Sequence, residues 1–138
     1  QGYIKRDKGG KKKMKLAASK PMHFVSSTGA DIYVGKNNRQ NDYITTTLAA
    51  KNDLWFHTKN IPGSHVVVMC GGKEVSDETL IYAATLAAEN SGAAAGAQVP
   101  VDYTPIKFVK KPNGAKPGMV IYTTNKTLYV TPDNGGKL

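Results

Sequence analysis

Short hydrophobic runs separated by turn residues open the regular part of the chain. Residues 22–26 and 31–35 each have the pattern of a short β-strand, and a Ser-Thr-Gly-Ala sequence at 27–30 joins them. Glycine and serine favour tight turns, so this segment predicts a β-hairpin. Residues 41–51 carry hydrophobic side chains at helical spacing, although three consecutive threonines at 45–47 weaken the prediction of a helix.

Two further strands are predicted in the middle of the chain. Within residues 53–58 the side chains alternate, so a leucine and a phenylalanine face one way while Trp55 and His57 face the other. An Ile-Pro-Gly sequence then turns the chain. The hydrophobic run at 65–70 predicts a strand in the centre of a sheet, and two glycines end it.

The clearest helix signal follows these strands. Ser76 is a suitable N-cap, and Asp77 and Glu78 suit the positive end of the helix dipole. Gly92 is a suitable residue to close the helix. The predicted core side consists mainly of small residues, which would let the helix lie close to a sheet: Leu80, Ala84, Ala87 and Ala88.

The last third of the chain predicts irregular structure followed by strands. Pro100 and Pro105 interrupt residues 98–109, and proline is rare in central strands, so we expect an edge strand or a loop there. Residues 119–123 and 127–131 predict a second hairpin. The whole order predicts an α+β fold, in which a mostly antiparallel sheet built from hairpins carries two packed helices.

Charge divides the chain into a basic lead and a nearly balanced remainder. The net charge is +9 over 138 residues, but the first 20 residues hold eight Lys and Arg and one acid. We therefore expect a basic, flexible, linker-like lead at 1–20, the end of a coiled-coil region. A folded domain at 21–133 and a frayed end at 134–138 follow. A basic lead suits a nucleic acid or an anionic membrane surface, but it is equally consistent with a solvated tail.

Other features of the composition narrow the class of protein. Hydrophobic residues make up 40%, which favours a globular domain over a disordered chain, and no hydrophobic run is long enough to span a bilayer. The single cysteine, Cys70, cannot form an internal disulfide. We expect a reduced, cytoplasmic setting and no membrane partner.

The first candidate site is the seven-residue polar run at 36–42, between a strand and a helix. Such a run could be an ordinary connection with Asn41 as the helix cap. It could also bind RNA, because Lys36 and Arg39 would flank the start of a helix, where phosphate binds well. The side-chain amides of Asn37, Asn38 and Gln40 could then bind a base edge or a ribose hydroxyl.

The second candidate site is the strand face that carries Trp55 and His57. An aromatic ring beside an imidazole can form a platform for base stacking, although Trp55 could simply pack in the core. Gly63 and Ser64 follow in a tight turn whose backbone donors could contact phosphate. A third cluster could contribute phosphate contacts or form a plain solvated loop: Lys107, Lys110, Lys111 and Lys116.

Metal and catalytic sites find less support in the sequence. His57, His65 and Cys70 match no recurring zinc spacing, and an odd separation along one strand points His65 and Cys70 in opposite directions. Ser64, His65 and Asp53 include the residue types of a catalytic triad, but adjacent residues rarely meet as nucleophile and base. We expect no metal, no cofactor and no catalysis. An RNA-processing enzyme that uses the two histidines is an open alternative.

Three consecutive motifs resemble a known family. The sequence DIYVGKNNRQNDY at 31–43 is followed by DLWFHT at 53–58 and IPGSHV at 61–66. Together they closely resemble the NFACT-R domain, and the resemblance runs from about residue 20 to about residue 132. At matching positions it implies RNA-facing roles for Lys36, Asn37, Asn38 and Arg39, with Trp55, His57, Ser64 and His65 as the adjoining surface.

The resemblance also implies a biological context. Bacterial proteins that end in this domain carry further NFACT-N, helix-hairpin-helix and coiled-coil regions. They act in ribosome-associated quality control, binding tRNA and the large subunit while alanine is added to stalled chains without a template. We therefore expect tRNA, large-subunit rRNA and other domains of the same chain as partners. Family members are often labelled fibronectin-binding proteins, so an adhesion module for fibronectin is the alternative.

Overall fold

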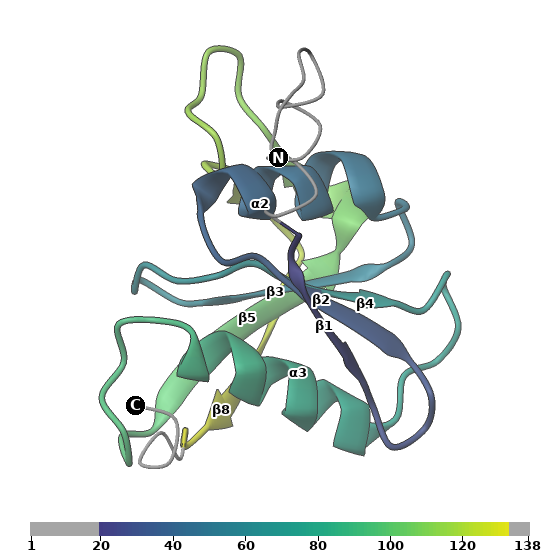
Figure 1. The fold of residues 1–138 in the computed structure, drawn as a ribbon, viewed down its shortest axis with the longest axis vertical. Helices are drawn as coiled ribbons and strands as arrows, with labels where there is room; N and C mark the ends of the chain where they lie inside the picture. Colours follow the sequence, from purple (N-terminus) through teal and green to yellow (C-terminus); the bar gives the residue numbers. More distant parts are fainter. Residues whose placement is uncertain (1–19, 133–138) are drawn as a thin grey trace, which may run out of the picture.

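One six-stranded antiparallel sheet organises residues 20–132, which are the residues that the computed structural model describes. The strand order is β1-β2-β4-β3-β5-β8, and one layer covers each face of the sheet (Figure 1). The strands are β1 (Met22–Val25), β2 (Asp31–Val34), β3 (Leu54–Thr58), β4 (Val66–Met69), β5 (Val99–Pro105) and β8 (Lys126–Val130). The α+β fold is therefore confirmed.

Residues 1–19 and 133–138 lie outside the described part of the chain. The predicted basic lead, except its last residue, and the predicted frayed end fall there. No helix within residues 20–132 is both long enough and apolar enough to cross a membrane.

The first predicted hairpin is present. Strands β1 and β2 pair antiparallel, with Phe24 opposite Ile32. The turn is held by the Ser26 hydroxyl, which accepts the backbone N–H groups of Thr28 and Ala30. Gly29 has a φ of 89°, a backbone conformation that glycine adopts without a steric penalty, which explains why this turn contains glycine.

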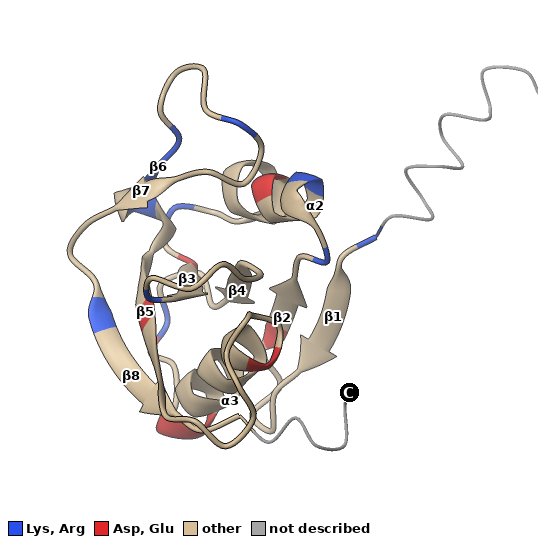
Figure 2. Cartoon of the chain, turned by 90° about the vertical axis from the view of Figure 1, so that its left-hand side faces the viewer, with Lys and Arg blue, Asp and Glu red and all other residues tan. Residues whose placement is uncertain are grey.

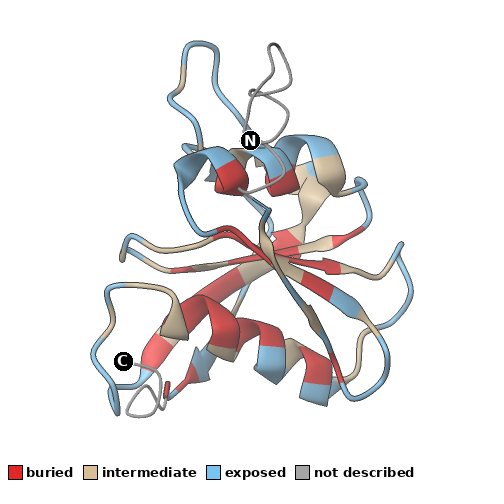
Figure 3. Cartoon of the chain, viewed as in Figure 1, coloured by how far each residue is buried: buried red, intermediate tan, exposed pale blue. Residues whose placement is uncertain are grey.

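The alternation predicted for residues 53–58 separates two hydrophobic clusters, one on each face of the sheet. Phe56 belongs to the larger cluster, which α3 (Asp77–Glu89) covers. Trp55 belongs to the smaller cluster with Ile44 and Val67, on the opposite face. Strand β4 is central, between β2 and β3, as predicted. Figure 3 shows these buried positions concentrated along the strands and on the inner sides of the helices.

Helix α3 matches its sequence signal closely. The Ser76 hydroxyl accepts the N–H of Thr79 at 3.1 Å, so Ser76 is the N-cap. The helix ends with Asn90 as its C-cap, two residues before Gly92. The alanines predicted to face the core are buried, and Leu80 packs against them: Ala84, Ala87 and Ala88.

The helical layer on the other face begins earlier than predicted. It consists of α2 (Asn38–Tyr43), continued by a π-helical segment, η1 (Ile44–Leu48). The N-cap is Asn37, not Asn41: its side-chain oxygen accepts the N–H of Gln40 at 2.9 Å. The Gln40 side chain in turn accepts the N–H of Lys36 at 2.9 Å, which resembles the reciprocal pattern of a capping box. Local hydrogen bonding thus starts the helix inside the polar run.

The prediction for residues 98–109 was wrong, because β5 is a seven-residue strand between β3 and β8. Pro100 has a β8 partner but lies beyond the last pair with β3. Pro105 has a β3 partner but lies beyond the last pair with β8. Each proline therefore lies at an end of the strand, where its missing N–H interrupts no continuous ladder.

The second predicted hairpin is also wrong. Strand β7 (Ile121–Tyr122) pairs with β6 (Val109–Lys110), while β8 pairs with β5. Between β7 and β8 the chain changes direction at Thr124, whose φ is 58°. The Thr104 hydroxyl donates to the backbone carbonyls of Thr123 and Thr124 and fixes this bend. A short 3₁₀ segment, η2 (Ile106–Phe108), joins β5 to β6.

Candidate nucleic-acid interface

The two layers that cover the sheet carry opposite charge. Residues 36–51 and 106–122 cover the Trp55 face, and they hold seven Lys and Arg with one acid, Asp42. Residues 71–98, which include α3 on the other face, hold one Lys and four acids. Figure 2 shows the basic residues around α2, β6 and β7 and an acidic end of the molecule at α3. A surface of one sign attracts an oppositely charged polymer, so we call the layer of residues 36–51 and 106–122 the basic cover.

The predicted binding residues at 36–39 are exposed on this cover. Among residues 20–132, no carboxylate forms an ion pair with Lys36 or Arg39, so both charged groups are available to a ligand. The side-chain oxygen of Asn37 accepts the N–H of Gln40 as the helix cap. This oxygen therefore stabilises the start of α2 and is already used within the protein. Asn38 lies at the edge of a cavity beside α2.

That cavity has a volume of about 490 Å³ and opens between α2, the β3–β4 turn and residues 118–122. Trp55, His57 and His65 line it together with Asn38, Asn41 and the hydrophobic side chains of Ile61, Pro62 and Met119. We call it the Trp55 cavity. Its size is within the range of ~300–1,000 Å³ that is usual for small-ligand sites.

The stacking platform predicted from the sequence is only partly present. Trp55 is 1% exposed, so its ring is a core residue rather than an open ledge. His57, which is half-buried, stacks on it at 5.8 Å with an angle of 8° between the planes. Tyr122 packs against the same indole at 4.8 Å. The aromatic rings are therefore stacked on one another, and a ligand would reach them through the cavity.

Trp55 also carries an unsatisfied donor. Its indole N–H is the one buried side-chain polar atom in residues 20–132 without a hydrogen-bond partner. Leaving such a donor unpaired costs about 1–3 kcal/mol of folding free energy. The large majority of buried side-chain donors in proteins are satisfied, so an exception in the wall of a cavity calls for an explanation.

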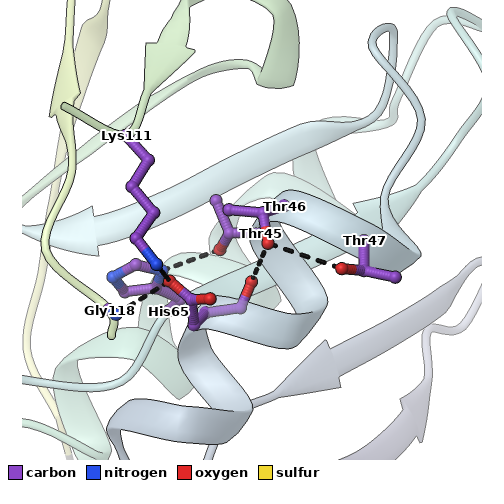
Figure 4. Close-up of polar contacts among 7 residues, drawn as sticks. Thr45, Thr46, Thr47, His65, Lys111 and Gly118 are labelled. Carbon is purple, nitrogen blue, oxygen red and sulfur yellow. Dashed lines mark hydrogen bonds and ion pairs between the residues drawn. The ribbon is translucent and has the colours of Figure 1, made fainter. Parts of the chain in front are cut away.

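His65 is a structural residue of the cavity wall. It is 3% exposed, and its Nδ1 atom forms a 2.7 Å hydrogen bond with the Thr45 hydroxyl (Figure 4). Burial, helped by the neighbouring His57 ring, lowers the pKa of His65 to about 4. Burial also lowers the pKa of His57, although backbone hydrogen bonds at Thr58 and Gly63 oppose that shift. Both rings are therefore neutral at physiological pH.

Lys111, a predicted RNA contact, forms an ion pair with Asp42. Its Nζ atom lies 2.8 Å from Asp42 Oδ1, which also accepts the N–H of Gly118 at 3.1 Å (Figure 4). Burial alone would raise the pKa of Asp42, but the hydrogen bonds from Lys111 and Gly118 and the charge of Lys111 outweigh it, so the pKa lies below its usual value. The contact ties the 111–118 loop to α2.

The other predicted lysines of this region are exposed but do not line the Trp55 cavity. The Nζ atom of Lys107 lies 5.4 Å from the centre of the Phe108 ring, and Lys107 borders a second hollow with Lys73 and Lys126. Lys110 lies on β6. Lys107 and Lys110 therefore add positive charge to the basic cover but do not form part of the cavity wall.

In the turn at Gly63 and Ser64, where we predicted backbone donors for phosphate, both donors of Ser64 are used within the protein. The Ser64 hydroxyl donates to the carbonyl of Gly35 at 2.5 Å, and its backbone N–H donates to the carbonyl of Asn90 at 3.0 Å. Gly63 forms an isolated antiparallel bridge with Ser91. The turn is therefore held by these contacts and supports the cavity from behind.

Several residues of the cavity carried no sequence signal as ligand contacts. Met119 and Tyr122 reach it from a segment far along the chain, and Asn41 was expected only as a helix cap. Within the described range, no group of three or more His, Cys, Asp and Glu is close enough to hold a metal ion. Tertiary structure, not spacing, brings these residues together.

Known proteins share this sequence and fold. The family model described as the NFACT protein RNA binding domain matches residues 20–124. The chain is 56% identical over 110 residues to the Rqc2 homolog RqcH of Bacillus subtilis (strain 168), covering 80% of this chain and 19% of that protein. It is 43% identical over 133 residues to the Rqc2 homolog RqcH of Streptococcus pneumoniae (strain ATCC BAA-255 / R6), covering 96% of this chain and 24% of that protein.

A solved structure is similar as well. It is described as the C-terminal of the fibronectin/fibrinogen-binding protein from Streptococcus suis, and it superposes with a TM-score of 0.78 at 43% identity. The match covers 96% of this chain and 48% of that one. The present chain thus spans no more than a quarter of the length of the RqcH relatives. By its matching family model and these relatives, the chain belongs to the family of NFACT protein RNA binding domains.

Proposed function

We propose that this chain binds RNA through its basic cover, as one domain of a ribosome-associated quality-control factor. The observation that carries the proposal is the segregation of charge between the two faces of the sheet. Lys36 and Arg39 are exposed and form no ion pair within residues 20–132, and they lie on the layer that holds seven basic residues and one acid, which is already paired. Lysine and arginine on one face are the electrostatic footprint of nucleic-acid binding.

The proposed RNA partners are tRNA and the rRNA of the large ribosomal subunit. The names of the RqcH relatives motivate this assignment, since they are Rqc2 homologs of which the chain spans 19–24%. On this proposal the chain works beside other domains of a full-length protein, in the cytoplasm, while alanine is added to stalled nascent chains. Those activities belong to the whole factor.

Binding, rather than catalysis, is the proposed activity of this domain. An enzyme that used the two histidines would need them accessible and able to exchange protons near neutral pH. His65 is 3% exposed, is bonded to Thr45 and has a pKa of about 4, which favours a structural role. His57 has a lowered pKa and stacks on Trp55.

The test compares two double variants that lose the same charge. In Lys36→Ala/Arg39→Ala the loss falls on the basic cover, while in Lys73→Ala/Lys126→Ala it falls beside the second hollow. Binding to labelled tRNA and to large ribosomal subunits is measured over a series of salt concentrations. We expect the first variant to bind more weakly and its log K against log salt slope to shrink by about 1–2, since each lost phosphate contact removes about 0.7–0.9.

Two results would contradict the proposal. Equal affinity for the wild type and a folded Lys36→Ala/Arg39→Ala variant would remove the basic cover as the RNA surface. Equal weakening in both double variants would mean that only net charge matters. Salt-resistant and nuclease-resistant binding of the wild-type chain to fibronectin, with no RNA binding, would favour adhesion instead.

A further inference from the structure

We propose that the Trp55 cavity binds a single unpaired nucleobase of the RNA, turned out of its strand, while Lys36 and Arg39 hold the phosphates beside it. This inference rests on the proposed RNA binding and adds the form of RNA recognised: a segment with at least one unstacked base rather than a continuous duplex. Single-stranded RNA is commonly recognised in this way, by bases held among aromatic side chains.

The shape of the cavity suits a flat heterocycle. Its volume is about 490 Å³, and its walls combine the stacked rings of Trp55 and His57 with hydrophobic side chains. Met119 lines the cavity, is 58% exposed and can adjust to the face of a base because methionine is flexible. The histidine rings of the wall are neutral, so the interior does not attract phosphate itself.

Two side-chain donors of residues that line the cavity have no hydrogen-bond partner within residues 20–132 and could pair with the edge of a base. The buried indole N–H of Trp55 has no partner within residues 20–132. Asn41 is 4% exposed and uses its side-chain oxygen to accept the N–H of His65 at 3.0 Å. Its side-chain NH₂ group forms no hydrogen bond within the described residues, so it can donate to a ligand. Carbonyl oxygens and ring nitrogens of bases accept such bonds.

The rim of the cavity suits the sugar-phosphate chain that a bound base would bring with it. Asn38 lines the cavity from α2. Lys36 and Arg39 lie within two positions of Asn38 in the sequence, one on each side of it. The nearest carboxylate on the helix, Asp42, is neutralised by Lys111. A neutral or anionic peptide would not need this combination of flat apolar walls, base-edge donors and flanking cations.

Trp55 is the only tryptophan of the chain, so its fluorescence reports directly on the cavity. The experiment titrates the chain with a single-stranded hexanucleotide RNA, with the same oligomer made abasic throughout, and with a blunt RNA duplex. We expect the intact single strand to quench or shift the Trp55 emission. The abasic oligomer, with equal charge, should leave the emission unchanged and bind about 10-fold more weakly, since base–aromatic stacking contributes most of that factor.

Variants of exposed wall residues test the site without disturbing the core. Met119→Ala and Asn38→Ala should weaken binding of the intact strand but not of the abasic oligomer. Ile121→Ala is the matched control, because Ile121 is 60% exposed on the same segment and does not line the cavity. It should behave as the wild type.

The outcomes separate this inference from the proposed function. If intact and abasic oligomers bind equally, and Lys36→Ala/Arg39→Ala weakens both, RNA binding stands and the base site is overturned. If that double variant changes nothing, the proposed function falls and the base site falls with it. A short uncharged aromatic peptide that quenches Trp55 as strongly as RNA does would also overturn the base site.

Discussion

Gly35 and Asn41 approach each other so closely that position 35 has no room for a side chain. A Cβ atom on Gly35 would lie 2.0 Å from Asn41 Oδ1 and 2.7 Å from the Asn41 backbone nitrogen. The same Oδ1 accepts the N–H of His65, and the Gly35 N–H donates to the His65 carbonyl at 3.1 Å. These contacts join the end of β2, helix α2 and the start of β4, and so they fix the wall of the Trp55 cavity.

Replacing Gly35 with alanine should therefore destabilise the fold. The new methyl group must displace backbone and a buried amide, and overpacking of this kind costs about 1–3 kcal/mol. Chemical denaturation of Gly35→Ala measures the loss. Gly92→Ala is the control, since its Cβ would meet only ordinary contacts, with Ile61 at 3.5 Å and the Pro62 carbonyl oxygen at 4.0 Å. If Gly35→Ala unfolds at the same denaturant concentration as Gly92→Ala, the close approach does not constrain the fold.

The same contacts show what the sequence could predict of the site and what it could not. The polar run after β2 correctly marked a corner with exposed Lys36 and Arg39, because unpaired charges remain at the surface whatever the packing. The roles of its amides were harder to assign, since the side-chain oxygen of Asn37 accepts a bond in the helix cap and that of Asn41 accepts the N–H of His65, 24 residues away. Long-range partners of this kind leave no trace in local spacing.

Secondary structure divides in the same way. The β1–β2 hairpin, β3, β4 and α3 follow from alternation, a cap and hydrophobic runs, which are local signals. Strand β5 was missed because proline in a sequence does not tell whether it falls inside a ladder or, as Pro100 and Pro105 do, at its ends. The pairing of β7 and β8 was predicted wrongly because their partners, β6 and β5, come from other parts of the chain.

Burial of His65 should make the protein less stable in mild acid. Its folded pKa is about 4 against an ordinary 6.5, so between those values the unfolded chain binds a proton that the folded chain does not. Stability from this residue is fully present above about pH 6.5 and is lost as the pH falls toward 4. The difference amounts to about 3 kcal/mol.

Unfolding curves of the wild type and His65→Gln at pH 7.5 and 5 measure this loss, and histidine ¹⁵N shifts report the charge of the ring directly. We expect His65→Gln to have a smaller pH dependence than the wild type. His23→Gln is the control, because His23 is exposed and pairs with Asp31 at the surface. Titration of the His65 ring near pH 6.5 in the folded protein would show that burial does not suppress its charge.

Asp102 should be a major support of the segment that closes the cavity. It is 1% exposed and accepts hydrogen bonds from Tyr122 at 2.5 Å and from Thr127 at 2.7 Å, with the ammonium group of Lys59 at 3.2 Å. Burial alone would raise the pKa of Asp102, but these hydrogen bonds and the charge of Lys59 outweigh it, so the pKa is lowered.

Asp102→Asn keeps the size of the side chain but loses the charge and part of the acceptor capacity. We expect it to lower the free energy of unfolding by about 1.5–3 kcal/mol near neutral pH, the range for hydrogen bonds to a charged group. Because the folded pKa of Asp102 is depressed, the difference from wild type should begin to shrink as the pH falls below about 4, the ordinary pKa of an aspartate, and should disappear as the pH falls through the lower folded pKa. Asp31→Asn, at an exposed carboxylate, should change little. A difference that persists unchanged at pH 3 would mean that the charge of Asp102 contributes nothing.

Releasing Lys111 from Asp42 should strengthen RNA binding while costing little stability. In Asp42→Asn the only acid of the basic cover is neutralised and the Lys111 ammonium is free to contact phosphate. We expect tighter tRNA binding and a log K against log salt slope steeper by about 0.7–0.9, the value of one added phosphate contact. The loss of a partly exposed ion pair should lower the free energy of unfolding by less than about 1 kcal/mol.

The double variant Asp42→Asn/Lys111→Ala is the control for this prediction. Its log K against log salt slope should return to that of the wild type if the freed lysine is responsible. Weaker binding by Asp42→Asn would instead mean that the ion pair serves RNA by holding the 111–118 loop against α2, and that the position of this loop matters more than the charge it releases.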